Sequence, residues 1–334
     1  MKHPIRRRLM FMAFSALRAC VGRLPLPVAR ALGSALGMAA YLGLRRHRKL
    51  AQAHLRMAFG PALSDMTCGY VARRTFLNLG KNAMEWFVLD RLAPDALLRL
   101  VEVHGLSHLR QALAKGQGVI ALSAHFGNWE LLALALVSLG FEGGVVARRL
   151  RYPEYEAFLR NMRQRKGVQT HARGGTFKEI ARELRANHII GMMPDQDIDS
   201  LEGVFVDFFG RPTYTPVGPA ALALMTGATI LPCFIVRIGR RFRIVIEEAI
   251  PVAGSGDRAQ ELLEITQTWS RVVESYIRAH PDHWVWMHRR WKTQRAVENP
   301  VAEARDLAPA AASPAACGTS SPMRARSHAT SGLS

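Results

Sequence analysis

Residues 118–130 read GVIALSAHFGNWE. Val119–Ser123 is a short apolar run, which is typical of a buried strand, and it leads to His125 beyond its carboxyl end. Gly127 permits a tight turn, and Asn128 is a favourable cap for the start of a helix. The stretch therefore predicts a strand, a turn and a helix in succession, which is the local pattern of an α/β domain.

The same alternation continues on both sides of this stretch. Predicted strands are Val101–His104, Val119–Ser123, Gly144–Ala147, Ile189–Met193, Thr229–Val236 and Phe242–Glu247. Predicted helices are His47–Phe59, Ser64–Leu89, Asn128–Leu139, Pro153–Lys166, Thr176–Ala186, Pro216–Thr226 and Arg258–Ala279. The alternation indicates an α/β fold with a mostly parallel central sheet flanked by helices. In such a fold the chemistry lies at the carboxyl ends of the strands.

Positive charge is concentrated near the N-terminus. The formal net charge is +19, and no Asp or Glu occurs before Asp65. Two apolar runs, Leu9–Leu17 and Leu24–Leu44, lie between the basic residues of this part. Basic residues beside apolar segments suit a membrane with anionic lipid better than a nucleic-acid groove. We expect residues 1–50 to form a helical, basic-apolar membrane-anchoring segment, and we expect no nucleic-acid partner.

Several other kinds of site are not supported. The four cysteines are scattered without a CxxC pair, and no HExxH is present, so we expect no metal site. No GxSxG surrounds Ser123, which argues against a serine hydrolase. From about Pro300 the chain is rich in Ala, Pro and Ser, and residues 300–334 are predicted to be a disordered tail.

His125 and Glu130 are the first candidates for catalysis. Glu130 falls in the first turn of the predicted helix, and the preceding turn can fold its carboxylate back onto one ring nitrogen of His125. The other nitrogen would then face a cleft as a general base. Such a base is worth about 10² to 10⁴ in rate when a hydroxyl must attack. The five-residue spacing of His125 and Glu130 is also compatible with a structural role, in which His125 is a hydrogen-bonded histidine at a strand end and takes no part in catalysis.

Residues 125–130, HFGNWE, resemble the HxxxxE motif of the bacterial lipid A biosynthesis acyltransferases. Other segments are similar to that family in the same order along the chain. They are FLNLGK at 76–81 with Glu85, PDQD at 194–197, GVFVDFFGRP at 203–212 followed by Gly218-Pro219-Ala220, and WMHRRWK at 286–292. The resemblance runs from the N-terminal segment to about Lys292, and the ordered motifs make it specific.

The resemblance implies a glycerol-3-phosphate acyltransferase-like fold, with the acyltransferase domain at residues 51–299. It implies transfer of a fatty acyl group from an acyl carrier protein or coenzyme A thioester to a hydroxyl of a lipid A precursor, a phosphorylated glycolipid. His125 would be the general base and Glu130 its partner, without a cofactor. Substrate-binding candidates are Arg148, which could hold the donor phosphate or the thioester oxyanion, Asp195, Asn128, Arg211, His288 and Arg289. The implied location is a bacterial inner membrane, with the catalytic domain on its cytoplasmic side.

Two departures from the family pattern concern the acceptor. Tyr152-Pro153 stands where the family usually has Asn-Pro, and His54 stands where an Asn is usual. A same-family enzyme that acylates a lysophospholipid, an aminolipid or a mannosylated glycolipid is therefore an alternative. A non-enzymatic membrane adaptor is a second alternative.

Overall fold

The computed structural model describes residues 4–173, 177–252 and 256–294, which belong to a compact unit spanning Met1–Arg295. The predicted tail, residues 300–334, lies outside the described residues. The helices are α1 (Pro4–Val21), α2 (Leu26–Gly43), α3 (Arg45–Phe59), η1 (Gly60–Ala62), α4 (Asp65–Leu89), α5 (Pro94–Leu98), α6 (Leu106–Leu113), α7 (Trp129–Ser138), α8 (Pro153–Arg165), α9 (Phe177–Arg185), α10 (Gly218–Thr226), α11 (Arg258–Ala279) and η2 (Pro281–His283). The strands are β1 (Val101–His104), β2 (Val119–Leu122), β3 (Gly143–Ala147), β4 (Val168–Ala172), β5 (Ile189–Met192), β6 (Gly203–Asp207), β7 (Pro212–Pro216), β8 (Thr229–Ile238) and β9 (Arg241–Ile246).

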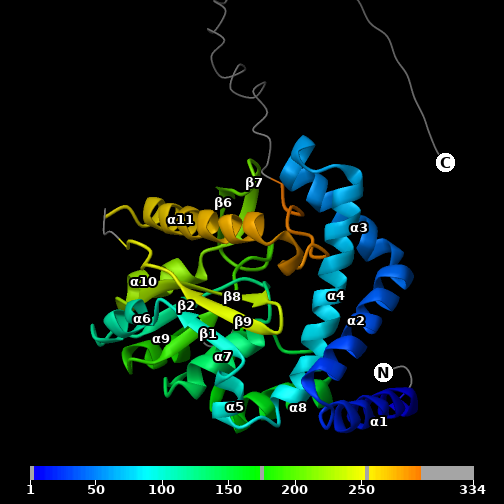
Figure 1. The fold of residues 1–334 in the computed structure, drawn as a ribbon. Helices are drawn as coiled ribbons and strands as arrows, with labels where there is room; N and C mark the ends of the chain where they lie inside the picture. The colour runs from blue at the N-terminus through cyan, green and yellow to red at the C-terminus, as the bar shows by residue number, and fades with distance from the viewer. Residues whose placement is uncertain (1–3, 174–176, 253–255, 295–334) are drawn as a thin grey trace, which may run out of the picture. The chain divides into compact units, whose positions relative to one another are not determined.

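A seven-stranded sheet is the centre of the fold, and its strand order is β1-β9-β8-β2-β5-β3-β4. The strands from β8 to β4 in this order are mutually parallel. Strand β9 is antiparallel to β8, and β1 is parallel to β9. Helices flank this sheet, as Figure 1 shows. The predicted α/β class with a mostly parallel central sheet is confirmed. Strands β6 and β7 form a separate antiparallel hairpin.

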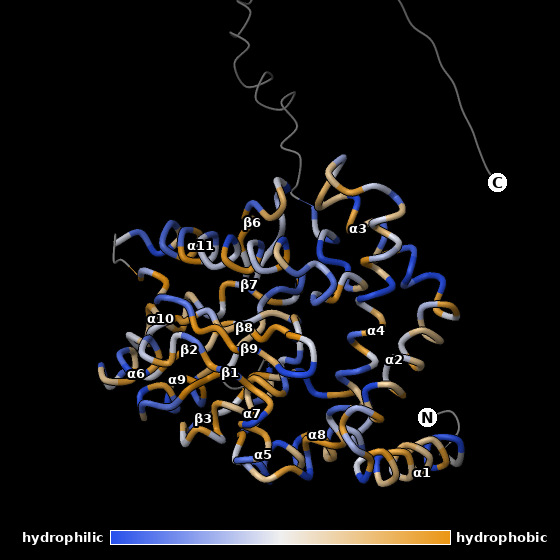
Figure 2. The backbone as a smooth tube through the Cα atoms, viewed as in Figure 1, coloured by the Kyte–Doolittle hydropathy of each residue, from blue (hydrophilic) through white to orange (hydrophobic). Residues whose placement is uncertain are grey.

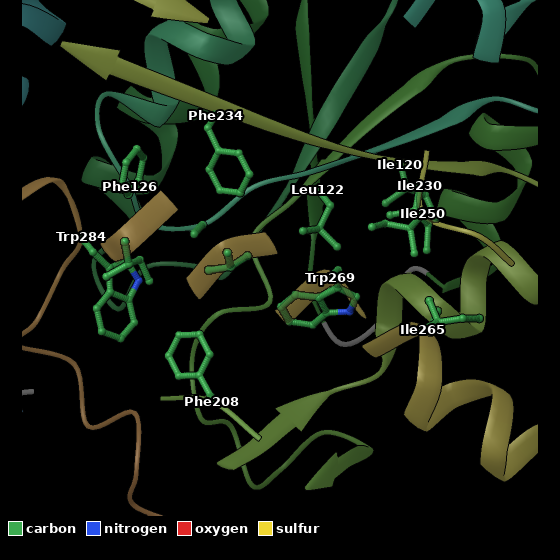
Figure 3. Close-up of a cluster of buried hydrophobic side chains, with 14 of the residues drawn as sticks. Ile120, Leu122, Phe126, Phe208, Ile230, Phe234, Ile250, Ile265, Trp269 and Trp284 are labelled. Atoms are coloured by element: carbon green, nitrogen blue, oxygen red, sulfur yellow. The ribbon is translucent and has the colours of Figure 1, made fainter. Parts of the chain in front are cut away.

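Strand β2 lies at the middle of the sheet and is buried on both faces. Ile120 and Leu122 belong to one apolar cluster, which also contains residues of α9, α10 and α11. Figure 3 shows part of this cluster, with Trp269 of α11 near Leu122 and Ile265 of the same helix on the side of Ile250. Ala121 belongs to the opposite cluster, which contains residues of α6 and α7. Because helices cover both faces, chemistry is left to the ends of the strands.

Helices α2 and α4 lie side by side, and glycines make their contact possible (Figure 1). A Cβ at Gly80 would lie 2.0 Å from the carbonyl oxygen of Gly33, and one at Gly37 would lie 2.3 Å from that of Phe76. The two backbones therefore approach more closely than any larger residue at these positions allows. This contact fixes α2 against α4.

The N-terminal helices expose apolar side chains. In α1, which contains the apolar run Leu9–Leu17, Figure 2 shows hydrophobic colours over much of the helix. Exposed large apolar residues of α1 and α2 are Leu9, Met10, Met12, Leu17, Val28, Leu32, Leu36 and Leu42. Within the described ranges, no helix combines the length and the apolar character that crossing a membrane requires.

The glycine contact generates a first prediction. Gly80→Ala should lower the free energy of unfolding by about 1–3 kcal/mol, because the added Cβ forces α2 and α4 apart. Gly69→Ala is the matched control in the same helix, since a Cβ there would lie 3.6 Å from the nearest atom, an ordinary contact. Denaturant unfolding of the purified protein measures both. Equal stability of Gly80→Ala and the wild type would contradict the close packing.

Candidate active site

Parallel pairing of β2 and β5 brings two candidate residues together. Leu122, the last residue of β2, is in register with Met192, the last residue of β5. His125 and Asp195 each lie three residues beyond these positions. Both side chains therefore leave the sheet at the same edge, as expected for the carboxyl ends of neighbouring parallel strands.

The carboxylate of Asp195 holds His125 in place. Its Oδ1 lies 2.8 Å from Nδ1 of His125, and its Oδ2 accepts from the backbone N–H of the same residue at 3.0 Å. The indole Nε1 of Trp284 also donates to Oδ2, at 2.8 Å. Because a carboxylate accepts, Nδ1 of His125 carries its hydrogen and Nε2 is unprotonated. The lone pair of Nε2 accepts a long hydrogen bond, 3.4 Å, from Nε2 of Gln196.

The two groups stabilise each other's charge. Burial alone would lower the pKa of His125, but the charge of Asp195 and the hydrogen bond to it outweigh this effect and raise the pKa above its usual value. Burial alone would raise the pKa of Asp195, but the charge of His125 and the three donated hydrogen bonds lower it to about 2. Asp195 is therefore ionised near neutral pH, and His125 is a stronger base than an isolated imidazole.

The predicted hydrogen bond between His125 and Glu130 is wrong. Glu130 instead forms a bidentate ion pair with Arg163 of α8, with Nε of Arg163 2.9 Å from Oε2. The physical reason is that Glu130 lies in the first turn of α7 and faces α8, whereas strand pairing places Asp195 directly against the imidazole. Glu130 still raises the pKa of His125 through its charge.

The turn between His125 and α7 is tightly fixed. Gly127 has φ of +60°, and a Cβ there would lie 1.9 Å from the carbonyl oxygen of Ile235, so only glycine fits. The N–H of Gly127 donates to the carbonyl oxygen of His283 at 2.9 Å, and Nδ2 of Asn82 donates to the carbonyl oxygen of Gly127 at 2.6 Å. Phe126 pairs with Trp284 in a short antiparallel bridge, and Figure 3 shows these two side chains near each other.

Asn128 supports the turn rather than the cavity wall. Its Oδ1 accepts from the N–H of Leu131 at 3.2 Å and caps α7, as predicted, and its Nδ2 donates to Glu85 at 2.8 Å. Glu85 is fully buried and pairs with Arg30 of α2 and Arg237 of β8. Burial alone would raise the pKa of Glu85, but its hydrogen bonds and ion pairs with the two arginines lower it. This buried charge cluster ties the start of α7 to three other elements.

A cavity of about 680 Å³ opens beside His125. Its polar wall includes His125, Gln196, Arg148 and Arg173, and Nε2 of Gln196 lies 3.4 Å from Nε2 of His125. Much of the rest is apolar, including Leu132, Leu136, Val137, Phe141, Val145 and Val168. Nε2 of His125 can therefore act as a base on a group bound at the polar end of an apolar cavity.

The structure brings only some of the predicted substrate-binding residues to this cavity. Arg148, which follows β3, lines it. Arg211 lies in the β6–β7 turn, where its Nε donates to the carbonyl oxygen of Met57 at 3.2 Å. Arg289 is exposed. Among the described residues, the cavity wall does not include these two arginines, Asn128, His288 or Asp195, which lies behind His125. Their roles in binding stay predictions.

His288 has a structural contact behind the site. Its Nε2 accepts from the backbone N–H of Asp197 at 3.1 Å, and burial lowers its pKa to about 4. The side chain is therefore neutral and holds the segment that carries Asp195. The adjacent Arg290 is also buried, and it donates to Tyr214 and Thr215.

Sequence reasoning missed four residues of the site. Arg163 pairs with Glu130 and Trp284 donates to Asp195, but the local sequence around neither residue indicates its carboxylate partner. Arg173 and Gln196 line the cavity. Gln196 lies in the PDQD motif, which did not assign it a role, and Arg173 lies in no motif. Position directly after a predicted strand could have pointed to Arg173, but its strand, β4, was not predicted either. Within residues 4–173, 177–252 and 256–294, no cluster of three His, Cys, Asp or Glu side chains could hold a metal ion.

Comparison with known proteins gives concordant matches over most of the chain. Residues 2–293 match the family described as bacterial lipid A biosynthesis acyltransferase. The chain is 35% identical over 220 residues to a phosphatidylinositol mannoside acyltransferase of Mycobacterium tuberculosis, which covers 64% of this chain and 67% of that one. It is 27% identical over 285 residues to the lipid A biosynthesis lauroyltransferase of Escherichia coli, with 82% and 88% covered. A palmitoleoyltransferase of Escherichia coli is 27% identical over 298 residues, with 83% and 89% covered.

The pairing of His125 with Asp195 predicts a measurable shift. Asp195→Asn should lower the pKa of His125, because the raising influence of the carboxylate is lost and the lowering influence of burial stays. Titration of the His125 ring by NMR, assigned with a His125→Gln sample, reports the value. Asp199→Asn is the control, since that exposed carboxylate pairs with Lys292. An unchanged pKa in Asp195→Asn would contradict the pairing.

Proposed function

The chain belongs to the bacterial lipid A biosynthesis acyltransferase family, and we propose that it transfers a fatty acyl group from an acyl carrier protein or coenzyme A thioester to a hydroxyl of a lipid A precursor. As a member it is an acyltransferase, so the alternative of a non-enzymatic adaptor is not supported. The observation that carries the proposal is the unprotonated Nε2 of His125 at the polar end of the apolar cavity.

The proposed reaction begins with proton removal. Nε2 of His125 takes the proton of the acceptor hydroxyl as the oxygen attacks the thioester carbonyl carbon. Asp195 keeps the imidazole in the required tautomer and stabilises the imidazolium that forms. When the carbon–sulfur bond breaks, the imidazolium returns the proton to the leaving thiolate. Both substrates are present together, because the sequence pairs no Ser or Cys nucleophile with this histidine.

The cavity is the proposed site for the fatty acyl chain. Its apolar wall comes from α7, β3 and β4, and it ends beside His125. Transfer of each buried methylene from water to such a wall is worth roughly 0.8 kcal/mol. The chain would thus anchor the donor while the thioester lies at the polar end. Arg148, also at that end, is proposed to contact substrate.

A mannosylated glycolipid is the second candidate acceptor. The similarity to the mycobacterial phosphatidylinositol mannoside acyltransferase favours it, because that identity, 35%, exceeds the 27% to the lauroyltransferase. The same base and the same cavity serve both reactions, since each acylates a sugar hydroxyl of a lipid. The two candidates differ in acceptor and share the site.

One assay tests the reaction and the acceptor together. Purified protein is incubated with acyl carrier protein and coenzyme A thioesters of several acyl chain lengths. The acceptor is either a lipid A precursor or a phosphatidylinositol mannoside. The masses of the products are measured by mass spectrometry. We expect an ester on the lipid A precursor and a loss of about 10² to 10⁴ in rate for His125→Ala. The rate should fall as pH drops through the raised pKa of His125, because the base must be unprotonated.

The control for that assay is His104→Ala, since His104 is exposed and lies outside the cavity wall. Wild-type activity of His125→Ala would contradict the proposed base. If only the phosphatidylinositol mannoside is acylated, the mannosylated glycolipid replaces the lipid A precursor as the proposed acceptor. No transfer to either acceptor from any of these donors would contradict the proposal.

We also propose that the N-terminal helices bind the inner membrane and hold the catalytic unit on its cytoplasmic side. The support is the set of exposed apolar residues on α1 and α2 together with the absence of acidic residues before Asp65. Apolar side chains and positive charge on the same helices favour an anionic lipid surface. The occupant of this face is therefore proposed to be a membrane.

Vesicle binding tests the membrane proposal. Leu32→Glu combined with Leu36→Glu should weaken binding to phosphatidylglycerol-containing vesicles more than about tenfold, because two exposed apolar contacts are lost and negative charge is added. Met66→Glu in α4, which is 84% exposed, is the control. Co-sedimentation with these vesicles and with pure phosphatidylcholine measures the difference. Equal pelleting of the double variant and the control would contradict the assignment.

A further inference from the structure

Two arginines leave neighbouring strands at the edge where the site lies. In the parallel pair β3–β4, Ala147 is in register with Ala172, and the N–H of Arg173 donates to the carbonyl oxygen of Ala147 at 2.9 Å. Arg148 and Arg173 are the next residues, so their backbones emerge roughly 5 Å apart. Both line the same cavity as His125.

Neither guanidinium is neutralised by the protein. In the part of the chain that the structure describes, Arg148 and Arg173 take part in no ion pair, whereas Arg163 at the same cavity is paired with Glu130. Burial lowers the pKa of Arg173, and the positive charge of Arg148 lowers it further. Two like charges held this close are unfavourable unless an anion lies with them.

The charge of this pair also reaches the reacting end of the cavity. Arg173 acts to lower the pKa of His125, against the raising influence of Asp195. A ligand anion on the arginines would therefore lie within electrostatic range of the imidazole. The apolar wall beyond it fits a hydrocarbon chain. The ligand that fits both features is an amphiphile with an anionic group at the rim and a chain inside.

We infer that Arg148 and Arg173 together bind a phosphate ester group of a substrate, an inference that rests on the proposed function. Guanidinium groups match phosphate oxygens with paired hydrogen bonds, and two of them can share one phosphate. The phosphate can come from the phosphopantetheine arm of the donor or from the acceptor glycolipid. Arg148 extends β3 and Arg173 extends β4, so the rigid sheet sets their spacing before any ligand arrives.

Matched substrate pairs distinguish the two sources. One pair is a fatty acyl thioester of pantetheine and the same thioester of phosphopantetheine, used with one acceptor. The other pair is a glycolipid acceptor with and without its phosphate, used with one donor. Wild type should prefer the phosphorylated member of at least one pair in kcat/KM by about tenfold to a hundredfold. The pair that shows the preference identifies the source.

The variants Arg148→Gln, Arg173→Gln and their combination are measured on the same pairs. The double variant should lose the preference, so that its kcat/KM values for the two members of the pair become equal. Arg149→Gln is the matched control, because it removes the same charge from a neighbouring residue that does not line the cavity. A preference kept in the double variant, or no preference in the wild type, overturns the inference.

A binding measurement separates this inference from the proposed function. Inorganic pyrophosphate is titrated into the full-length wild type and the double variant at constant ionic strength, and binding is followed by calorimetry. Binding by the wild type and by Arg149→Gln, but not by the double variant, supports the anion site even if no acyl transfer is found. Equal binding by all three proteins, or binding by none, overturns it.

Discussion

The hydrogen bond between His125 and Asp195 depends on the pairing of β2 with β5, and much of the remaining structure serves to hold it. The two residues are 70 positions apart in the chain, and they meet because Leu122 and Met192 are in register. Trp284, 89 positions beyond Asp195, donates to the same carboxylate. The buried carboxylate of Asp195 thus connects the ends of β2 and β5 with the segment that follows η2. Its low pKa, about 2, records how strongly these donors favour its charged form.

The two carboxylates near His125 act in different ways. Asp195 sets the tautomer by direct contact, which leaves Nε2 unprotonated. Glu130 is held by Arg163, so it reaches the imidazole only as a charge that its own partner partly balances. A buried ion pair of this kind holds its groups in one geometry, and here it fixes α7 against α8 at the wall of the cavity. In this structure Glu130 of the HxxxxE motif pairs with Arg163 and holds α7 against α8. The residue that forms a hydrogen bond with the His125 ring is Asp195.

The local sequence pattern predicted most of the helices and strands, but it did not decide which strands pair. Helix α11 was predicted with both of its observed ends, because Asp257 caps it and its apolar residues recur at helical spacing. Strand β4 was missed because its residues alternate in burial at the edge of the sheet and include Gln169 and His171. The β6–β7 hairpin was missed because Pro212 and Pro216 argue against a strand. The carboxylate partner of His125 could not be read from spacing, since strand register decides it.

The N-terminal helices and the catalytic turn share one buried acid. Glu85 in α4 accepts from Asn128 at the start of α7 and also pairs with Arg30 of α2 and Arg237 of β8. Moving α2 away would remove one of two positive partners from a fully buried carboxylate, and breaking a buried ion pair costs about 3–5 kcal/mol. Glycine packing between α2 and α4 adds a steric limit to the same movement. We therefore expect α2 and the turn that carries His125 to move together, because the carboxylate of Glu85 contacts both.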